Sequence, residues 1–239
     1  MQQRVAIVTG GSSGIGLTLS LTLAQQGVAV IAVSRRASQK RELDREGISV
    51  VDGDVANPST AERAVSAALT RYGHVDLLVN NAGIFVAKPF SEYTQEDYAR
   101  LLATNFTGFL HLTQHTLRVM LERKAGHIVN ISTSLVAQPI AGVPCALPIA
   151  IKGGLEAATR SLAIEYAPSN IRVNAIAPGI IDTPMHAESG HAALAGLSPA
   201  HRIGRTEEVA QALLYLDQAS FVSGEILHLD GGAHAGKWN

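Results

Sequence analysis

Short apolar runs alternate along this chain with longer segments that carry apolar residues at helical spacing. Residues 5–8, 28–33 and 48–51 are almost entirely apolar and rich in β-branched side chains. Runs of this kind are typical of strands buried on both faces of a parallel sheet. Further strands are expected in the ranges 75–79, 126–134, 171–176 and 221–232.

Helices are expected between these strands. In residues 59–72, the helical period places an apolar face toward the core, made of Ala61, Ala64, Val65, Ala68 and Leu69. Such alternation of strands and helices predicts an α/β fold with a parallel sheet. The other expected helices end near Gly27 or cover residues 37–46, 94–124, 152–167 and 205–216, the last capped by Thr206.

One of these helices carries a conflicting pattern. Residues 17–23 alternate leucine with serine or threonine, which is the period of a strand. We still expect a helix, because Ile15, Leu19 and Leu23 share one helical face. A helix that packs flat on a sheet can use so wide an apolar surface.

A glycine-rich loop joins the first strand to this helix. Gly10, Gly14 and Gly16 allow the backbone to turn and to approach a ligand closely. The free N–H groups at the start of the following helix point into the loop, so an anion is expected there. The spacing is neither G-x-G-x-x-G nor that of a P-loop.

Several motifs together resemble those of the short-chain dehydrogenase/reductase family. They are T-G-x-x-x-G-x-G at 9–16, N-N-A-G at 80–83, A-T-N-F-T-G at 103–108 and P-G-x-x-x-T at 178–183. The resemblance covers residues 5–232. It implies one Rossmann-like, doubly wound domain with a seven-stranded parallel sheet in the order 3-2-1-4-5-6-7.

The resemblance also sets the expected extent and assembly of the protein. It implies that residues 1–239 form a single dinucleotide-binding domain. Residues 184–203, rich in Ala, Gly, His and Ser, look like a short substrate lid. Because relatives assemble through their long fourth and fifth helices, a homodimer or homotetramer is expected.

The expected cofactor is NADP(H), with NAD as the less favoured alternative. Ser34 stands where NAD-preferring relatives carry an acid, and Arg35 can offer a fork of donors to a 2′-phosphate. The alternative is that Arg35 and Arg36 are solvated charges. Asp54 and Val55 would flank the adenine by resemblance, or Asp54 caps a turn. The residues expected to bind the cofactor are Gly10, Ser12, Ser13, Gly14, Ile15, Gly16, Ser34, Arg35, Arg36, Asp54, Val55, Asn81, Ala82, Gly83, Lys152, Pro178, Gly179, Ile181 and Thr183.

The catalytic set implied by the resemblance is incomplete in this chain. Thr133, with Ser134 as a near substitute, would polarise a substrate carbonyl, and Asn105 would hold a water in a proton relay. The family then requires Tyr-x-x-x-Lys. Lys152 is present, but Pro148 stands four residues before it, so the phenol that donates the proton is missing.

Other proton donors follow from the residue types. A water held by Lys152 and Asn105 is the first to test. His186 can reach the pocket from a loop, although a loop histidine is more often solvated. Cys145 is expected to be a small buried hydrophobe, and the sequence does not place Tyr93 or Tyr98.

Composition excludes several classes of partner. The net charge of −1 and the pI of about 6.8 favour neither nucleic acid nor an anionic membrane. The single cysteine fits a reducing compartment, and we expect a cytoplasmic protein without a signal peptide. The uncharged stretch 128–151 contains prolines and polar residues that argue against a membrane span. No metal site is expected, because His111 and His115 lack the partners of a metal motif.

Two classes of function remain. The leading hypothesis is an NADP(H)-dependent oxidoreductase that acts on a small, fairly apolar carbonyl or alcohol with an atypical proton donor. The alternative is an NADP-binding scaffold or sensor in which Pro148 records lost chemistry. Reduction of an activated C=C bond is a third reading, which asks less of the acid.

Overall fold

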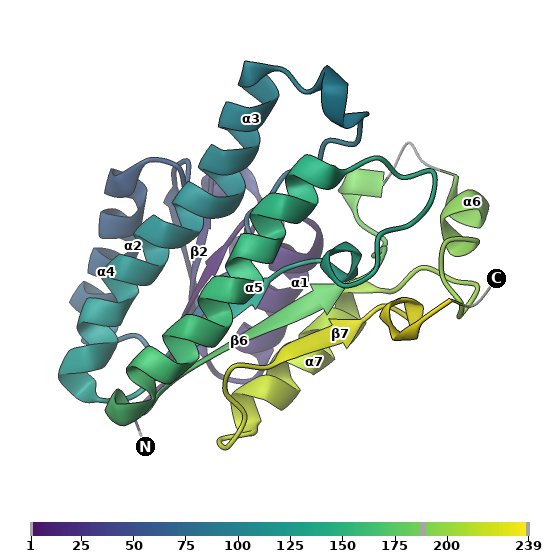
Figure 1. Cartoon of the computed structure of the whole chain (residues 1–239). Helices are drawn as coiled ribbons and strands as arrows, with labels where there is room; N and C mark the ends of the chain where they lie inside the picture. The colour runs from purple at the N-terminus through teal and green to yellow at the C-terminus, as the bar shows by residue number, and fades with distance from the viewer. Residues whose placement is uncertain (1, 187–189, 238–239) are drawn as a thin grey trace.

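Seven parallel strands form one sheet in the order β3-β2-β1-β4-β5-β6-β7, as expected (Figure 1). The computed structural model describes residues 2–186 and 190–237. Strand β1 is third in this order, with β2 and β3 on one side of it and β4 to β7 on the other. The strands are β1 (Val5–Thr9), β2 (Ala29–Ser34), β3 (Ile48–Asp52), β4 (Leu77–Asn80), β5 (Gly126–Ile131), β6 (Ile171–Pro178) and β7 (Ile226–Leu229).

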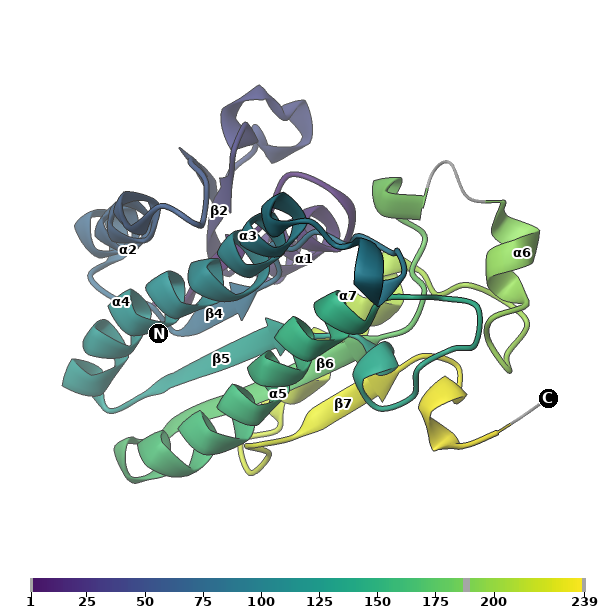
Figure 2. The same ribbon diagram turned by 45° about the horizontal axis from the view of Figure 1, so that its top comes forward.

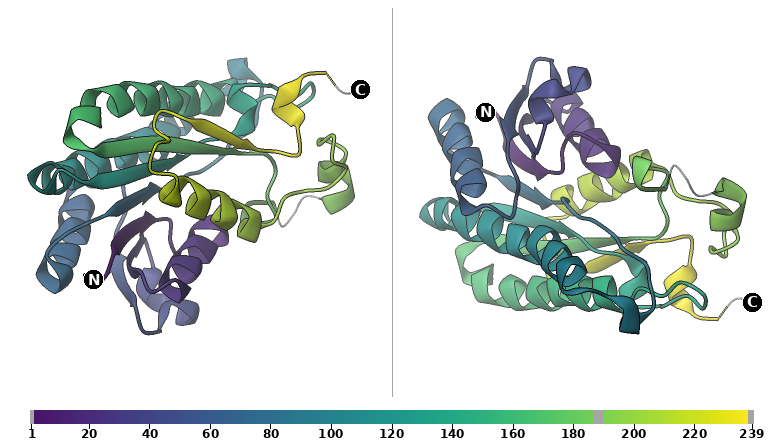
Figure 3. Two further views of the ribbon diagram at one scale, coloured as in Figure 1. Left: turned by 90° about the horizontal axis from the view of Figure 1, so that it is seen from below. Right: turned by 90° about the horizontal axis from the view of Figure 1, so that it is seen from above.

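Helices cover both faces of the sheet and bury it in two separate hydrophobic cores (Figure 3). One face is covered by α1 (Gly14–Gln25) and α7 (Thr206–Gln218), and the other by α2 (Pro58–Tyr72), α4 (Gly108–Arg123) and α5 (Ala146–Tyr166). Residues 17–23 are helical, because Leu19 and Leu23 are buried against the sheet. Burial on one face therefore overrides the alternating pattern.

The long helix expected over residues 94–124 forms with an interruption. It consists of α3 (Gln95–Leu102), a π-helical turn (Ala103–Thr107) and α4. The Thr94 hydroxyl accepts a hydrogen bond from the backbone N–H of Asp97, and Lys124 ends the helix in a left-handed conformation. The π turn contains Asn105, and such turns occur frequently at functional sites.

Two local predictions are wrong. Residues 37–46 form two short 3₁₀ turns, Ala37–Gln39 and Arg41–Leu43, which bury only Ala37 and Leu43. Thr206 is the first helical residue and not the cap of α7. Its hydroxyl accepts from Thr18, while the Glu208 carboxylate accepts from the backbone N–H of Arg205.

The ends of other elements also differ from expectation. Leu69 is 39% exposed, because it lies at the edge of the buried face of α2. Strand β5 ends at Ile131 and β7 covers only Ile226–Leu229, so both are shorter than predicted. Conversely, α5 begins at Ala146, ahead of the expected start at residue 152.

The carboxyl ends of the strands face the segments that carry most of the candidate site (Figure 2). Beyond this edge lie η7 (Pro184–His186), α6 (His191–Ala195) and the C-terminal turn η8 (Ala233–Ala235). The expected lid, 184–203, includes these first two elements, and its residues 187–189 lie outside the described residues. In open α/β sheets, ligands bind at this edge.

Candidate active site

The loop after β1 forms a cradle that only glycine permits. Gly10 and Gly14 have left-handed φ angles of +65° and +49°. A Cβ on Gly16 would collide with the Gly10 carbonyl oxygen, and one on Gly10 would lie 2.8 Å from Asn81 Nδ2. Helix α1 begins at Gly14 without an acidic residue in its first turn. The loop therefore presents free backbone N–H groups and suits an anionic ligand such as a pyrophosphate.

A turn from much later in the sequence closes one side of this cradle. A Cβ on Gly14 would lie 3.2 Å from Cβ of Thr183, the last residue of the P-G-x-x-x-T motif. The turn is fixed by Ile181, which is buried, and by the Gly179 backbone N–H, which donates to Leu229 O at 2.9 Å. Two motifs far apart in sequence thus border one space.

The N-N-A-G motif ties three strands together beside the glycine loop. Asn81 Nδ2 donates to Thr9 O at 2.9 Å, which joins β4 to β1. Asn80 Nδ2 donates to Asn130 Oδ1 at 2.9 Å, which joins β4 to β5, and to Thr113 Oγ1 at 3.0 Å. These bonds hold the strand ends without a bulky side chain above them, so a flat ligand can lie against Ala82.

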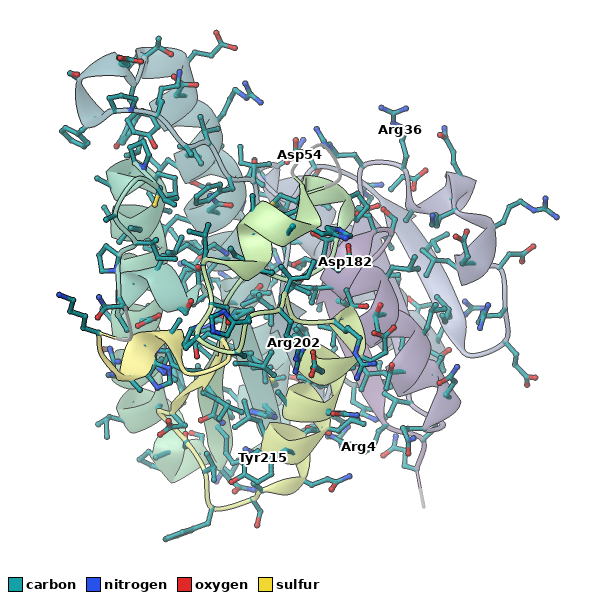
Figure 4. The ribbon with its side chains drawn as sticks, turned by 90° about the vertical axis from the view of Figure 1, so that its right-hand side faces the viewer. Arg4, Arg36, Asp54, Asp182, Arg202 and Tyr215 are labelled. Atoms are coloured by element: carbon teal, nitrogen blue, oxygen red, sulfur yellow. The ribbon has the colours of Figure 1, made fainter. Side chains whose placement is uncertain are left out.

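The tip of β2 carries two exposed arginines. Ser34 donates from Oγ to Ser12 Oγ at 2.7 Å, so the strand tip and the glycine loop are joined. Arg35 and Arg36 are exposed, and among the described residues neither has an ion-pair partner. Arg36 extends outward from the ribbon (Figure 4). Asp54 Oδ1 accepts a hydrogen bond from Ala56 N at 2.9 Å, so Asp54 caps a turn, as the alternative interpretation had it. This bond uses only one of its two carboxylate oxygens.

The side chains of Lys152 and Asn105 both lie close to Gly83. Lys152 Nζ donates to Ile131 O at 2.6 Å, and burial lowers the pKa of Lys152 to about 8. The Asn105 side chain is fixed on Ile84, accepting from its N–H at 2.8 Å and donating to its C=O at 3.0 Å. A Cβ on Gly83 would lie 3.0 Å from Asn105 Oδ1 and 3.4 Å from Lys152 Nζ, so both groups border the same glycine.

A small cavity of about 10 Å³ lies beside these two residues. Asn80, Thr104, Asn105 and Lys152 are among the residues that line it. Asn80 Oδ1 is buried and has no hydrogen-bond partner in the described part of the chain. A polar space of this size suits one water molecule.

Of the three hydroxyl groups after β5, those of Thr133 and Ser134 donate to no acceptor among the described residues, whereas that of Ser132 does. Ser132 Oγ donates to Glu156 Oε1 at 2.7 Å, so its proton is engaged in a buried bond. Thr133 Oγ1 only accepts, from Leu135 N at 3.4 Å, and its own proton stays available. Ser134 is 5% exposed. All three residues line the main pocket.

Pro148 lies in the first turn of α5 and faces the pocket. Proline fits there because the first turn of a helix does not use its N–H groups in internal hydrogen bonds. Lys152 follows one turn later on the same helix. Proline has no side-chain donor, so this position cannot supply a proton.

The main pocket has a volume of about 1360 Å³. It contains most of the predicted site residues: Gly10, Ser13, Gly14, Ile15, Asn81, Ala82, Gly83, Thr133, Ser134, Lys152, Pro178, Gly179, Ile181 and Thr183. Ser12, Gly16, Ser34, Arg35, Arg36 and Asp54 lie outside its lining, and Val55 and Asn105 border the small cavity.

The other possible proton donors differ in whether they line the pocket. His186 lines the pocket, and partial burial lowers the pKa of its imidazole. Burial raises the pKa of the Cys145 thiol, whose Sγ contacts Val143 O. Tyr93 donates to Val86 O at 2.7 Å and has a raised pKa, while Tyr98 is 42% exposed on α3. Neither tyrosine lines the pocket.

Sequence reasoning missed a polar cluster at the far wall of the pocket. It consists of His228, Asp230 and His234, and Arg100 lines the same pocket from α3. The available signal was the H-x-D-x-x-x-H spacing across the end of the last strand. Within 2–186 and 190–237, no group of three or more side chains is arranged to hold a metal ion, and no helix could span a membrane.

Comparisons with known proteins agree with this arrangement. The family model described as "Enoyl-(Acyl carrier protein) reductase" matches residues 10–234. A 3-oxoacyl-[acyl-carrier-protein] reductase of Thermotoga maritima is 36% identical over 97% of this chain and 98% of its own length.

Two solved structures share the whole fold. One is a 3-ketoacyl-(acyl-carrier-protein) reductase of Brucella melitensis complexed with NADH, with a TM-score of 0.92, 30% identity and coverage of 98% of this chain and 99% of that one. The other, ElxO with NADP bound, has a TM-score of 0.89, 27% identity and coverage of 99% and 100%. The chain belongs to the short-chain dehydrogenase/reductase family, whose members of this type are oxidoreductases.

Proposed function

We propose that this protein is an NADP(H)-dependent oxidoreductase that acts on a small, fairly apolar carbonyl or alcohol, without the usual tyrosine. The observation that carries the proposal is the single pocket that joins the glycine cradle to Thr133 and Lys152. A bound nicotinamide dinucleotide would supply or accept the hydride. The relatives bound to NADP and to NADH make such a cofactor the natural choice.

Residues at both ends of the pocket fit this cofactor. Gly10, Gly14 and Gly16 leave room for the pyrophosphate at the start of α1. Ala82, Gly83 and the turn with Thr183 would border the nicotinamide half. Arg35 is exposed and has no ion-pair partner within residues 2–186 and 190–237, which favours a 2′-phosphate, and therefore NADP(H) over NAD.

The remaining residues would orient the substrate and move a proton. Thr133 Oγ1 would donate to the substrate carbonyl oxygen, and the pocket wall would exclude bulk water. A water held by Lys152 and Asn105 would give a proton to that oxygen as negative charge develops on it. Lys152 would replace the proton, which suits a lysine whose pKa is about 8.

The first test combines binding with turnover. Wild-type protein is titrated with NADPH and NADH by calorimetry, and then assayed with NADPH on a panel of apolar ketones, aldehydes and enones. We expect tight NADPH binding and slow reduction. The K152M variant should lose about 10²–10⁴ in rate, the range for a lost acid–base group. Turnover restricted to enones would identify reduction of C=C bonds instead.

Restoring the phenol gives a matched comparison. The P148Y variant places a tyrosine one helical turn before Lys152, and we expect faster carbonyl reduction. Tight NADPH binding without turnover in either protein would favour the scaffold or sensor reading. Failure of both nucleotides to bind at millimolar concentration would exclude both readings.

A further inference from the structure

Two stacked imidazoles form a polar wall in the main pocket that the proposed chemistry does not use. His228 lies in β7, and His234 lies in η8, just after that strand. Their ring centroids are 4.0 Å apart and the planes are inclined by 17°. Both rings, together with Asp230, line the same pocket as Thr133 and Lys152.

Asp230 fixes the second imidazole in place. Its carboxylate is 1% exposed and accepts from the backbone N–H groups of Gly232 at 3.0 Å and His234 at 2.8 Å. It also lies 3.0 Å from His234 Nδ1, so that nitrogen carries a proton. A Cβ on Gly179 would be 2.9 Å from Asp230 Cβ, which leaves the carboxylate little freedom to turn away.

The first imidazole has an unused nitrogen. His228 Nε2 is buried and has no hydrogen-bond partner among the described residues. The other ring nitrogen, Nδ1, is not among the fully buried atoms and has no hydrogen-bond partner within the described residues, so it is the nitrogen that a ligand in the pocket can reach. The neighbouring strand offers only Ala177 at this register, and β6 therefore provides no partner.

The charges that line the pocket favour an anion. Arg202 is paired with Glu208 at 2.6 Å, and Asp230 is paired with His234 at 3.0 Å. Arg100 and Lys152 remain, and neither has an ion-pair partner among the described residues. A metal ion is a poor alternative, because stacked rings direct their in-plane lone pairs along parallel and not converging lines.

We propose that His228, stacked on the Asp230-anchored His234, binds the carboxylate of a substrate whose carbonyl or hydroxyl reacts elsewhere in the pocket. This inference rests on the proposed function and names its substrate class as oxo or hydroxy acids with an apolar body. Turn η8 packs against η5 (Ser134–Val136), which follows Thr133 directly. The acid end would therefore lie on the Thr133 side of the pocket.

The test compares two ketones of similar shape, 4-oxocyclohexanecarboxylate and the uncharged 4-methylcyclohexanone. Binding of each to protein saturated with NADP⁺ is measured by calorimetry, because the oxidised cofactor with a ketone gives no turnover. We expect the carboxylate to bind about tenfold or more tightly, as suits a charge-assisted hydrogen bond. In H228F, which keeps an aromatic ring, this preference should disappear while binding of the uncharged ketone is kept.

Two further variants make the outcome decisive. H228Q keeps a side-chain donor and should retain part of the preference. H115F makes the same substitution on α4, away from the pocket, and should leave the preference for the carboxylate unchanged. Equal affinity of wild type for both ketones, or equal weakening of both in H228F, would overturn the proposal. If neither ketone binds, the carboxylate proposal is also overturned. The proposed function would still stand in that case if other carbonyls are reduced with NADPH.

Discussion

At the scale of single residues, we propose that Arg35 sets the selectivity for NADP(H) over NAD. Removing its guanidinium in R35A should weaken NADP⁺ binding by about 10–100-fold, because a charge-assisted contact with the 2′-phosphate is lost. NAD⁺ carries no such phosphate, so its affinity should stay within about twofold. Calorimetric titration with both nucleotides measures the two effects. R41A, an exposed arginine in the next turn, is the matched control.

Equal weakening of both nucleotides in R35A would show that the arginine acts on the loop and not on the phosphate. It would remove the preference for NADP(H) while leaving a nicotinamide cofactor in place.

Lys152 predicts a pH dependence for carbonyl reduction. Burial lowers the pKa of Lys152 from 10.5 to about 8, so the ammonium form prevails below pH 8 and is lost above it. The rate constant kcat should therefore fall as pH rises through about 8. K152R stays charged throughout this range and should show a lower rate with no such fall. Steady-state rates measured on both sides of pH 8 test this prediction. A pH profile for K152R that matches that of wild type would contradict it.

At the scale of elements, a largely buried ionic network joins the residue before β1 to β5, β6 and α7. It lies where these strands begin, away from the pocket at their carboxyl ends. Asp217 accepts from Arg4 at 2.6 Å and contacts His127 Nδ1 at 3.2 Å. Arg172 donates to the Leu216, Asp217 and Val222 carbonyl oxygens. Although burial opposes it, bonding to His127 and Arg4 holds the pKa of Asp217 far below its ordinary 3.8. The network therefore aligns the strands that carry the site residues.

The network makes a prediction about stability. A carboxylate with a depressed pKa stabilises the fold above its unfolded value and loses that effect as pH falls below it. D217N should reduce the free energy of unfolding by roughly 1–3 kcal/mol at neutral pH, a value discounted because Arg4 is half-exposed. The difference should shrink toward pH 3. Urea unfolding at both pH values measures it, with D44N as an exposed control, and a constant difference would contradict this role.

The sequence predicted the elements better than their ends. Apolar runs such as 28–33 identified the buried strands, because burial on both faces leaves a strong signal. The helix expected over residues 37–46 does not form, since only two side chains of this segment reach the core. The π turn at Asn105 was beyond the sequence, because its geometry depends on bonds to Ile84 from a distant loop.

The candidate site was also predictable only in part, because some of its features depend on contacts between residues far apart in the sequence. The glycines were visible because their spacing is local and their φ angles are forced. The two stacked histidines were not recognised, because His228 gains its significance from a ring stack, from ring nitrogens without a partner among the described residues, and from the surrounding pocket. Those properties arise only when the strand ends meet.

At the scale of the whole molecule, the expected homodimer or homotetramer remains a prediction. Ile164 on α5 is 80% exposed, and Leu110 and Leu121 on α4 are each 38% exposed. Exposed apolar side chains on neighbouring helices are typical of an interaction surface. I164D should shift the protein toward monomers in light scattering, because a charge would be buried without a partner. A monomeric wild type, or a variant that stays assembled, would contradict this assignment.

The account as a whole depends on hydride transfer in a pocket that has proline in place of the usual phenol. The most direct measurement uses NADPH deuterated at nicotinamide C4, separately on each face, with the carbonyl panel and mass analysis of the products. The account predicts that deuterium from one face only appears on the carbinol carbon of a product. Tight binding of NADPH with no label in any product, under conditions where P148Y transfers label, would contradict it.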